Sequence, residues 1–430
     1  MSNIEILEKI TNFYLNSSDF NGIHITDLGE NFSEVKKVLK GLLEKEKIVL
    51  NFGDRHPNPH ILEFEPESKE QQMAKLEKFE FQTPIYKEYG PLKMQINSIS
   101  CCAYPSKNHL KSIVNPDDYR NKPFTLLLAQ GEPQLSYRTF NLRVLEFYRN
   151  DPRYYYETDD ICGSISSKSA SGLKEQDETF LQTFGFAYDR NIKNRYVAVF
   201  LRYLADLTPK HQQRWKLEEF IGDTFLHPDY ARSTCGQWPE KESIFNAFCE
   251  EIRVINEMTL KITGRPLFQK SYDRYKKPKK FSFLVRPTKE EYENFIHLLD
   301  KMMSDNLNKE FFKDRIDLVE LKKEGELFVK QNKGTIVLLE EWLNKSVRFP
   351  DTKPKDEMIK IFREIRSERC KPAHYVRDDD WDNQYFVKQR DLIKRAYEAV
   401  RTLRLIFANH PLAKTVEVPD WLYKGEIWTF

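Results

Sequence analysis

The sequence predicts a multidomain α+β protein, and three observations support this fold class. The chain has 430 residues, and at roughly 100–200 residues per domain we expect about two to four domains. Its hydrophobic content of 40% and charged content of 31% are typical of a water-soluble globular protein. Its patterning changes along the chain from mixed helix and strand, through a strand-rich part that becomes helical, to a last third that is almost wholly helical. The expected parts are 1–66, 82–285, 288–412 and a tail at 413–430.

The N-terminal part has the pattern of a helix, a short strand, a second helix and a hairpin. Apolar residues at helical spacing predict one helix over residues 4–13 and another over 33–47, with Ser33 as its N-cap. Two strand-like runs follow, KIVLNF (47–52) and HILEF (60–64), and turn-forming residues separate them.

This order of elements resembles a winged-helix domain. The resemblance implies a helix that contacts DNA phosphates and a wing whose tip does the same. The alternative is a winged helix used for packing or protein contacts, because the second helix also carries Glu34 and Glu44 among its lysines. The candidate DNA-binding residues are Lys36, Lys37, Lys40 and Arg55.

The middle part predicts a mixed domain in which strands come first and helices follow. Helices are expected after the Thr208-Pro209 pair, a cap and first-turn signal, and over 242–262. We find no convincing metal or catalytic site here, and a sensor or ligand-binding role stays open. The candidate strands are 92–104, 124–129, 134–148 and 154–166.

A basic and aromatic run, KSYDRYKKPKKFSF (270–283), closes the middle part. Cations for phosphates together with rings for base stacking are the physical basis of single-strand nucleic-acid binding. A solvated interdomain linker stiffened by Pro278 is the alternative. The candidate RNA-binding residues are Lys270, Arg274, Tyr275, Lys276, Lys277, Lys279 and Lys280.

The C-terminal part predicts a helical bundle. Apolar residues recur at helical spacing over 288–304, 316–331, 334–346, 355–370 and 383–408. In the fourth of these segments the apolar stripe ends at Ile365, and the next position on the stripe is Arg369. An arginine in that position needs an anion or a carboxylate, because removing its charge from water without a partner is costly.

The stretch Arg369-Cys370-Lys371-Pro372-Ala373-His374 resembles the motif of HEPN domains, in which a histidine follows an arginine a few residues later. Arg366 in the context IRSER and the long amphipathic helix expected over 384–410 are similar to that family as well. The resemblance covers residues 290–412 and implies an all-α bundle that pairs two motifs across a homodimer. It also implies a metal-independent ribonuclease of the toxin, antiphage-defence or abortive-infection type.

The resemblance implies three catalytic residues: Arg369, His374 and Arg366. RNA supplies its own nucleophile, the 2′-hydroxyl. His374 would act as general acid or base, and the arginines would stabilise charge on the scissile phosphate. No cofactor and no metal are expected. The alternatives are an internal salt bridge at Arg369, a winged-helix DNA-binding regulator, and a ligand sensor or scaffold whose bundle serves only for dimerisation.

The sequence also predicts where the protein works and with what. Its first residues carry Glu5 and Glu8 instead of a signal-peptide pattern, and its longest mainly apolar stretch, 196–207, is shorter than the ~20 residues of a membrane span. We therefore expect a cytoplasmic protein that does not contact membranes. The net charge of +2 leaves nucleic-acid binding to local patches. The expected partners are RNA and a second copy, with duplex DNA and a partner or inhibitor protein as further candidates.

Overall fold

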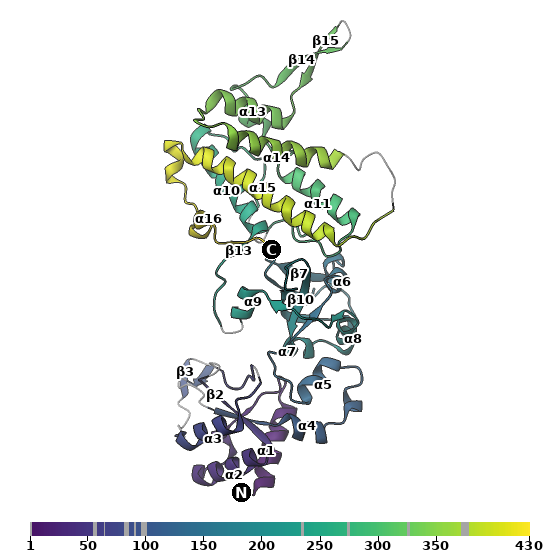
Figure 1. The fold of residues 1–430 in the computed structure, drawn as a ribbon, viewed down its shortest axis with the longest axis vertical. Helices are drawn as coiled ribbons and strands as arrows, with labels where there is room; N and C mark the ends of the chain where they lie inside the picture. Colours follow the sequence, from purple (N-terminus) through teal and green to yellow (C-terminus); the bar gives the residue numbers. More distant parts are fainter. Residues whose placement is uncertain are drawn as a thin grey trace. The chain divides into compact units, whose positions relative to one another are not determined.

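The computed structural model describes residues 2–54, 58–63, 65–80, 86–89, 92–95, 101–233, 236–272, 276–324, 327–370 and 378–430. It is a mixed α+β protein that divides into two compact units, as the multidomain prediction expects (Figure 1). The first unit is Met1–Tyr156, Cys162–Ala187 and Arg195–Trp238. The second unit is Glu157–Ile161, Tyr188–Asn194 and Pro239–Phe430. Residues 239–285, which we expected in the middle part, therefore group with the C-terminal helices.

The first unit begins with a small sheet covered by helices. A capping box between Ser2 and Glu5 starts the first helix, and Asn31, not the expected Ser33, caps the second. The strand order is β1-β5-β2, and both pairings are antiparallel. The elements are α1 (Asn3–Asn16), β1 (Ile23–His24), a 3-10 turn η1 (Ile25–Leu28), α2 (Phe32–Glu44), β2 (Ile48–Phe52) and β5 (Cys101–Pro105).

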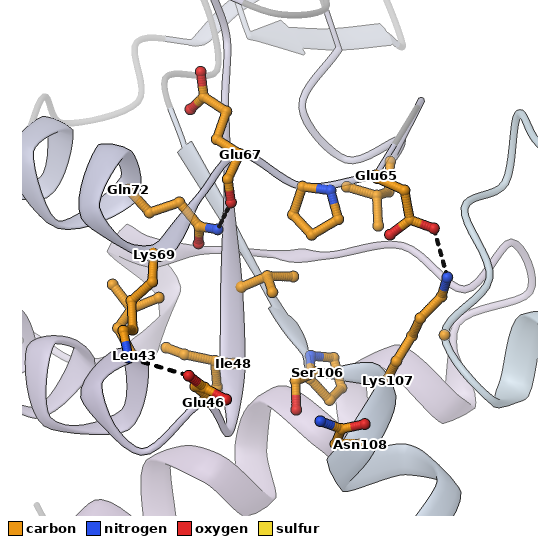
Figure 2. A pocket seen from close by; sticks show the side chains of 15 residues that line it. Leu43, Glu46, Ile48, Glu65, Glu67, Lys69, Gln72, Ser106, Lys107 and Asn108 are labelled. Carbon is orange, nitrogen blue, oxygen red and sulfur yellow. Dashed lines mark hydrogen bonds and ion pairs between the residues drawn. The ribbon is translucent and has the colours of Figure 1, made fainter.

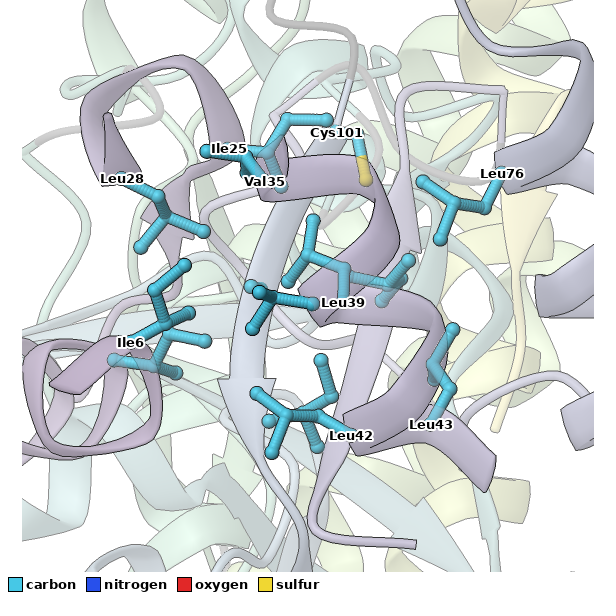
Figure 3. Close-up of a cluster of buried hydrophobic side chains, with 14 of the residues drawn as sticks. Ile6, Ile25, Leu28, Val35, Leu39, Leu42, Leu43, Leu76 and Cys101 are labelled. Carbon is cyan, nitrogen blue, oxygen red and sulfur yellow. The ribbon is translucent and has the colours of Figure 1, made fainter. Parts of the chain in front are cut away.

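The core of this region lies between the sheet and the helices (Figure 3). Ile6 of α1 and Leu39 of α2 are fully buried in it. Leu76 joins them from α3 (Lys69–Lys78), a helix between the first two expected parts of the chain. The chain between β2 and β5 also forms the hairpin β3 (Tyr86–Tyr89) and β4 (Leu92–Gln95).

The predicted hairpin between 47–52 and 60–64 is wrong. Residues 60–63 form no strand, and β2 pairs instead with β5, which lies about fifty residues further along the chain. The segment that follows β2 is held by a side chain, since Asn51 donates hydrogen bonds of 3.0 and 2.9 Å to the carbonyls of Pro59 and Ile61. Residues 60–63 are therefore tied to β2 through Asn51 without adding a strand to the sheet.

A seven-stranded sheet forms the rest of the first unit, with the order β11-β6-β10-β9-β8-β7 and β12 beside β9. Its strands are β6 (Tyr137–Phe140), β7 (Tyr154–Thr158), β8 (Cys162–Ser167), β9 (Phe180–Tyr188), β10 (Arg195–Phe200), β11 (Glu219–Phe220) and β12 (Phe225–Leu226). Its helices are α4 (Lys107–Ile113), α5 (Pro123–Ala129), α6 (Val144–Asn150), α7 (Leu201–Ala205), α8 (Pro209–Leu217) and α9 (Pro228–Ser233), with short 3-10 turns η2 (Pro116–Tyr119) and η3 (Glu175–Asp177).

Of the expected strands in this region, 124–129 is wrong and 134–148 is confirmed only at β6. FTLLLA forms the helix α5, which Pro123 opens in its first turn, and the end of 134–148 forms α6. Short apolar runs do not distinguish a strand from a buried helix by periodicity alone. The expected helix after Thr208 is confirmed as α8.

The second unit is a set of packed helices that carries one β-hairpin (Figure 1). Its helices are α10 (Ile244–Thr263), α11 (Lys289–Met302), α12 (Lys309–Phe312), α13 (Thr335–Ser346), α14 (Lys353–Cys370), α15 (Gln384–Ala408) and α16 (Asp420–Lys424). The tail after 412 forms the 3-10 turn η5 (Pro411–Thr415), α16 and the strand β16 (Ile427–Trp428), which pairs in parallel with β13 (Glu242–Ser243).

The helix expected over 316–331 is wrong. This segment forms the antiparallel strands β14 (Val319–Glu324) and β15 (Leu327–Asn332). Val319 and Leu321 stand two residues apart, which is the spacing of one face of a strand. Both are exposed, at 42% and 64%, so neither side chain joins the core.

Candidate active site

The two motif arginines lie together near the end of α14. Met358, Phe362 and Ile365 form the buried face of this helix. Arg366 and Arg369 follow them, with side chains that are 33% and 26% exposed. Arg369 continues the apolar stripe, as expected, but it lies at the edge of the core. Its charge requires partners there.

Two aspartates supply those partners. Nη1 of Arg369 lies 2.7 Å from Oδ2 of Asp300 and 2.5 Å from Oδ2 of Asp305. Nη2 of Arg366 lies 2.6 Å from Oδ1 of Asp305, and its Nε lies 3.1 Å from Oδ2 of Asp300. Asp300, in the last turn of α11, is fully buried. The carboxylates therefore hold both guanidinium groups at one place.

Sequence reasoning missed both aspartates. Asp300 follows Phe295, Ile296 and Leu299 on the buried face of α11. A carboxylate on an otherwise apolar helix face was the available signal, because a buried charge needs a partner elsewhere in the fold. Asp300 on α11 thus corresponds to Arg369 on α14: each is a charged residue on an otherwise apolar helix face.

The contacts of Asp305 and Arg369 favour the charged form of each side chain. Burial raises the pKa of Asp305, but hydrogen bonds and charge from Arg366 and Arg369 outweigh it and lower the pKa overall. The hydrogen bond to Asp300 in turn raises the pKa of Arg369.

Arg369 keeps part of its donor capacity. Its bonds to Asp300 and Asp305 all use Nη1, whereas a guanidinium carries five N–H donors. Within the described ranges, Nε and Nη2 have no hydrogen-bond partner. With 26% of the side chain exposed, these donors are available to an oxyanion from outside.

His374, the third residue of the motif, lies outside the described residues, and so do Arg55, Arg274 and Tyr275. α14 ends at the exposed Cys370, directly before the segment that holds His374.

The basic run after α10 is partly built into the core. The ammonium of Lys277 pairs with Asp160, and these side chains are 7% and 2% exposed. Ser282 and Ser243 also donate hydrogen bonds to the Asp160 carboxylate. The rings of Phe281 and Phe283 are buried and offer no surface for bases. The exposed cations of the run are Lys270, Lys276, Lys279 and Lys280.

α3 engages two of the three candidate DNA-binding lysines on α2. Nζ of Lys36 donates to the carbonyls of Glu77 and Phe79 at 2.7 and 3.2 Å. Nζ of Lys40 lies 2.8 Å from Oε1 of Glu77. Lys37 is exposed. The outer face of α2 is therefore partly covered by a helix of the same chain.

A pocket of about 350 Å³ lies in the first unit beside β2 (Figure 2). Its three carboxylates each pair with a lysine: Glu46 with Lys69, Glu65 with Lys107, and Glu67 with Lys75. The remaining lining combines apolar and polar side chains, among them Leu43, Ile48, Leu62, Gln72, Ser106 and Asn108. The pocket could hold a small ligand, but its ion pairs leave no catalytic arrangement comparable to the arginine cluster.

No family model, curated protein or solved structure matches the chain. In the described ranges, no three or more His, Cys, Asp or Glu residues are placed to hold a metal ion. None of the helices in these ranges has the length and apolar character needed to cross a membrane.

Proposed function

We propose that the protein is a metal-independent endoribonuclease of HEPN type, with Arg369, Arg366 and His374 as its catalytic residues. The arrangement of Arg369 is the observation that carries the proposal. Its guanidinium is fixed through one nitrogen by Asp300 and Asp305, while its other donors face no partner in the described part of the chain. Such preorganised donors are most effective where charge develops in a transition state.

The chemistry follows from the substrate. The 2′-hydroxyl of RNA attacks the adjacent phosphorus, and an imidazole accepts its proton. The guanidinium groups stabilise the charge on the non-bridging oxygens. The P–O5′ bond breaks, and an acid donates a proton to the leaving 5′ oxygen. The products are a 2′,3′-cyclic phosphate and a 5′-hydroxyl. No atom changes its oxidation state, so the reaction needs no oxidant or reductant.

The test is cleavage of total RNA by the purified full-length chain in excess EDTA. We expect Arg369→Ala and His374→Ala to lower the rate about 10²–10³-fold, as loss of an oxyanion donor or of a general acid or base does. Arg363→Ala is the matched control, because Arg363 lies on the same helix, 53% exposed, and pairs with Glu340. Cleavage that survives both catalytic substitutions at the wild-type rate would rule the proposal out.

The ion pairs also favour a second candidate, in which the bundle is a scaffold for dimerisation. Asp300 is fully buried and forms ion pairs with both arginines, as an internal structural contact would. The same variants separate the two functions. A scaffold predicts that Arg369→Ala lowers the melting temperature while neither wild type nor variant cleaves RNA. A nuclease predicts loss of cleavage in a protein that is still folded and assembled.

For the N-terminal region we propose a winged-helix fold. The order α1, β1, η1, α2, β2, β5, with β5 between β1 and β2, supports it, and α3 with the β3-β4 hairpin would be inserted between the last two strands. Because α3 engages Lys36 and Lys40, we favour packing over duplex DNA binding as the role of this fold.

A further inference from the structure

His297 lies on α11, one helical turn before the buried Asp300. Residues three and four positions apart on a helix are surface neighbours, with Cβ atoms roughly 5–6 Å apart. His297 is exposed, whereas Asp300 is not. An imidazole that solvent can reach therefore stands beside the carboxylate that holds Arg369.

Contacts from α14 bring the guanidinium groups to this end of α11. Arg369 lies 2.7 Å from Asp300, and Arg366 lies 3.1 Å from the same oxygen. The sequence separation between His297 and Arg369 hides this arrangement, because four other elements (α12, β14, β15 and α13) lie between their two helices along the chain.

Two buried polar atoms nearby lack partners. Oδ1 of Asp300 and Oγ of Ser304 have no hydrogen bond within the described part of the chain, although both residues are fully buried. Buried polar atoms in native proteins are nearly always bonded, to protein or to ordered water. In the described ranges Asp300 therefore keeps one carboxylate oxygen without a hydrogen-bond partner, while its other oxygen binds the arginines.

We propose that His297 is a further catalytic residue of this site, the general base that takes the proton of the RNA 2′-hydroxyl while Arg369 holds the scissile phosphate. This inference rests on the proposed ribonuclease function and adds a residue to it. The O2′–H bond breaks as the O2′–P bond forms, and the proton passes to the imidazole. The P–O5′ bond breaks, and water donates a proton to the leaving 5′ oxygen.

The surroundings of His297 suit a base. Its partial burial and the positive charges of Lys301 and Arg369 lower its pKa, while Asp300 and Asp305 oppose this shift. The net direction favours the neutral imidazole at neutral pH, which is the form that accepts a proton.

The kinetic test compares His297→Ala with Asn294→Ala, an exposed position on the same helix. We expect His297→Ala to lower kcat about 10²–10⁴-fold with little change in KM, and to remove the acidic limb of the kcat/KM profile. Asn294→Ala should behave as wild type. Unchanged kcat and an unchanged acidic limb in His297→Ala would overturn the inference while the ribonuclease proposal stands.

A second readout does not need turnover. In histidine-labelled full-length protein, 3′-AMP should shift the His297 NMR signal and raise its pKa, because a phosphate beside the ring favours the imidazolium. Arg369→Ala should abolish this response, and Asn294→Ala should preserve it. A signal that 3′-AMP leaves unmoved overturns the inference. A response in a protein that cleaves no RNA would keep His297 at a phosphate-binding site and reject the ribonuclease function.

Discussion

Two arginines of one helix and two aspartates from the end of another form the candidate site. Each pair supplies the opposite charge that the other pair needs at the edge of the core. Arg366 and Arg369 occupy positions at the edge of the core because Asp300 and Asp305 accept their hydrogen bonds. The periodicity of α14 was sufficient to identify Arg369 as unusual. The identity of its partners required the fold, since Asp300 lies 69 positions away along the sequence.

Lys277 shows the opposite outcome for a residue chosen by composition. In a run rich in lysines it looks like one more solvated cation, but it is nearly as buried as its partner Asp160. Its neighbours Lys279 and Lys280 are exposed. The charge pattern of the run does not distinguish them, because burial depends on Asp160, which comes from a distant segment of the chain.

The first stability prediction concerns this pair. Lys277→Ala should lower the free energy of unfolding by about 3–5 kcal/mol, because it leaves the buried Asp160 carboxylate without its countercharge. Lys279→Ala, at an exposed position two residues away, should change it by less than about 0.5 kcal/mol. Urea unfolding followed by circular dichroism measures both. Equal effects at the two positions would show that Lys277 is solvated.

At the scale of elements, long amphipathic helices were predictable and short apolar runs were not. α10, α14 and α15 follow their expected segments closely. α5 was expected to be a strand, and the segment of the β14-β15 hairpin was expected to be a helix. A long helix repeats its apolar face several times, whereas FTLLLA, a run of six residues, fits either period. The segment 316–331 is longer, and the two-residue spacing of Val319 and Leu321 was its sign of a strand.

Packing between elements produces the second stability prediction. Gly185 in β9 faces the buried ring of Tyr230 in α9, and an added Cβ would lie 2.1 Å from two ring atoms. Gly185→Ala should therefore cost about 1–3 kcal/mol through overpacking.

Gly41 is the matched control, since the nearest atom to its added Cβ would lie 3.7 Å away. It stands inside α2, so Gly41→Ala should stabilise the protein by about 0.5–1 kcal/mol. Thermal unfolding of both variants measures the difference. A neutral Gly185→Ala would mean that the ring of Tyr230 moves aside easily.

At the scale of the whole molecule, the second unit is not one continuous segment. It includes Glu157–Ile161 and Tyr188–Asn194 as well as everything after Trp238. These two short segments supply Asp160 to Lys277 and the carbonyl of Ile192 to Arg390. A cut after residue 238 therefore removes contacts that belong to the second unit itself.

This discontinuity gives a prediction for fragment 239–430. Without Asp160, Lys277 is a buried cation without a countercharge, so Lys277→Met should stabilise the fragment. In the full-length chain the same substitution should destabilise, because it leaves Asp160 unpaired. Denaturant unfolding of the four proteins measures the two signs. The same sign in both backgrounds would contradict the assignment of Asp160 to this unit.

By itself, the sequence determined the α+β class, the long helices of the second unit and the one arginine, Arg369, that does not fit an apolar stripe. These are properties of local periodicity, and they survive without knowledge of the fold. Only the tertiary structure decided that β5 completes the first sheet, that Lys277 is buried and that Asp300, Asp305 and His297 share a place with the arginines. Each of these depends on residues far apart in the chain, whose contacts form only when the core closes around them.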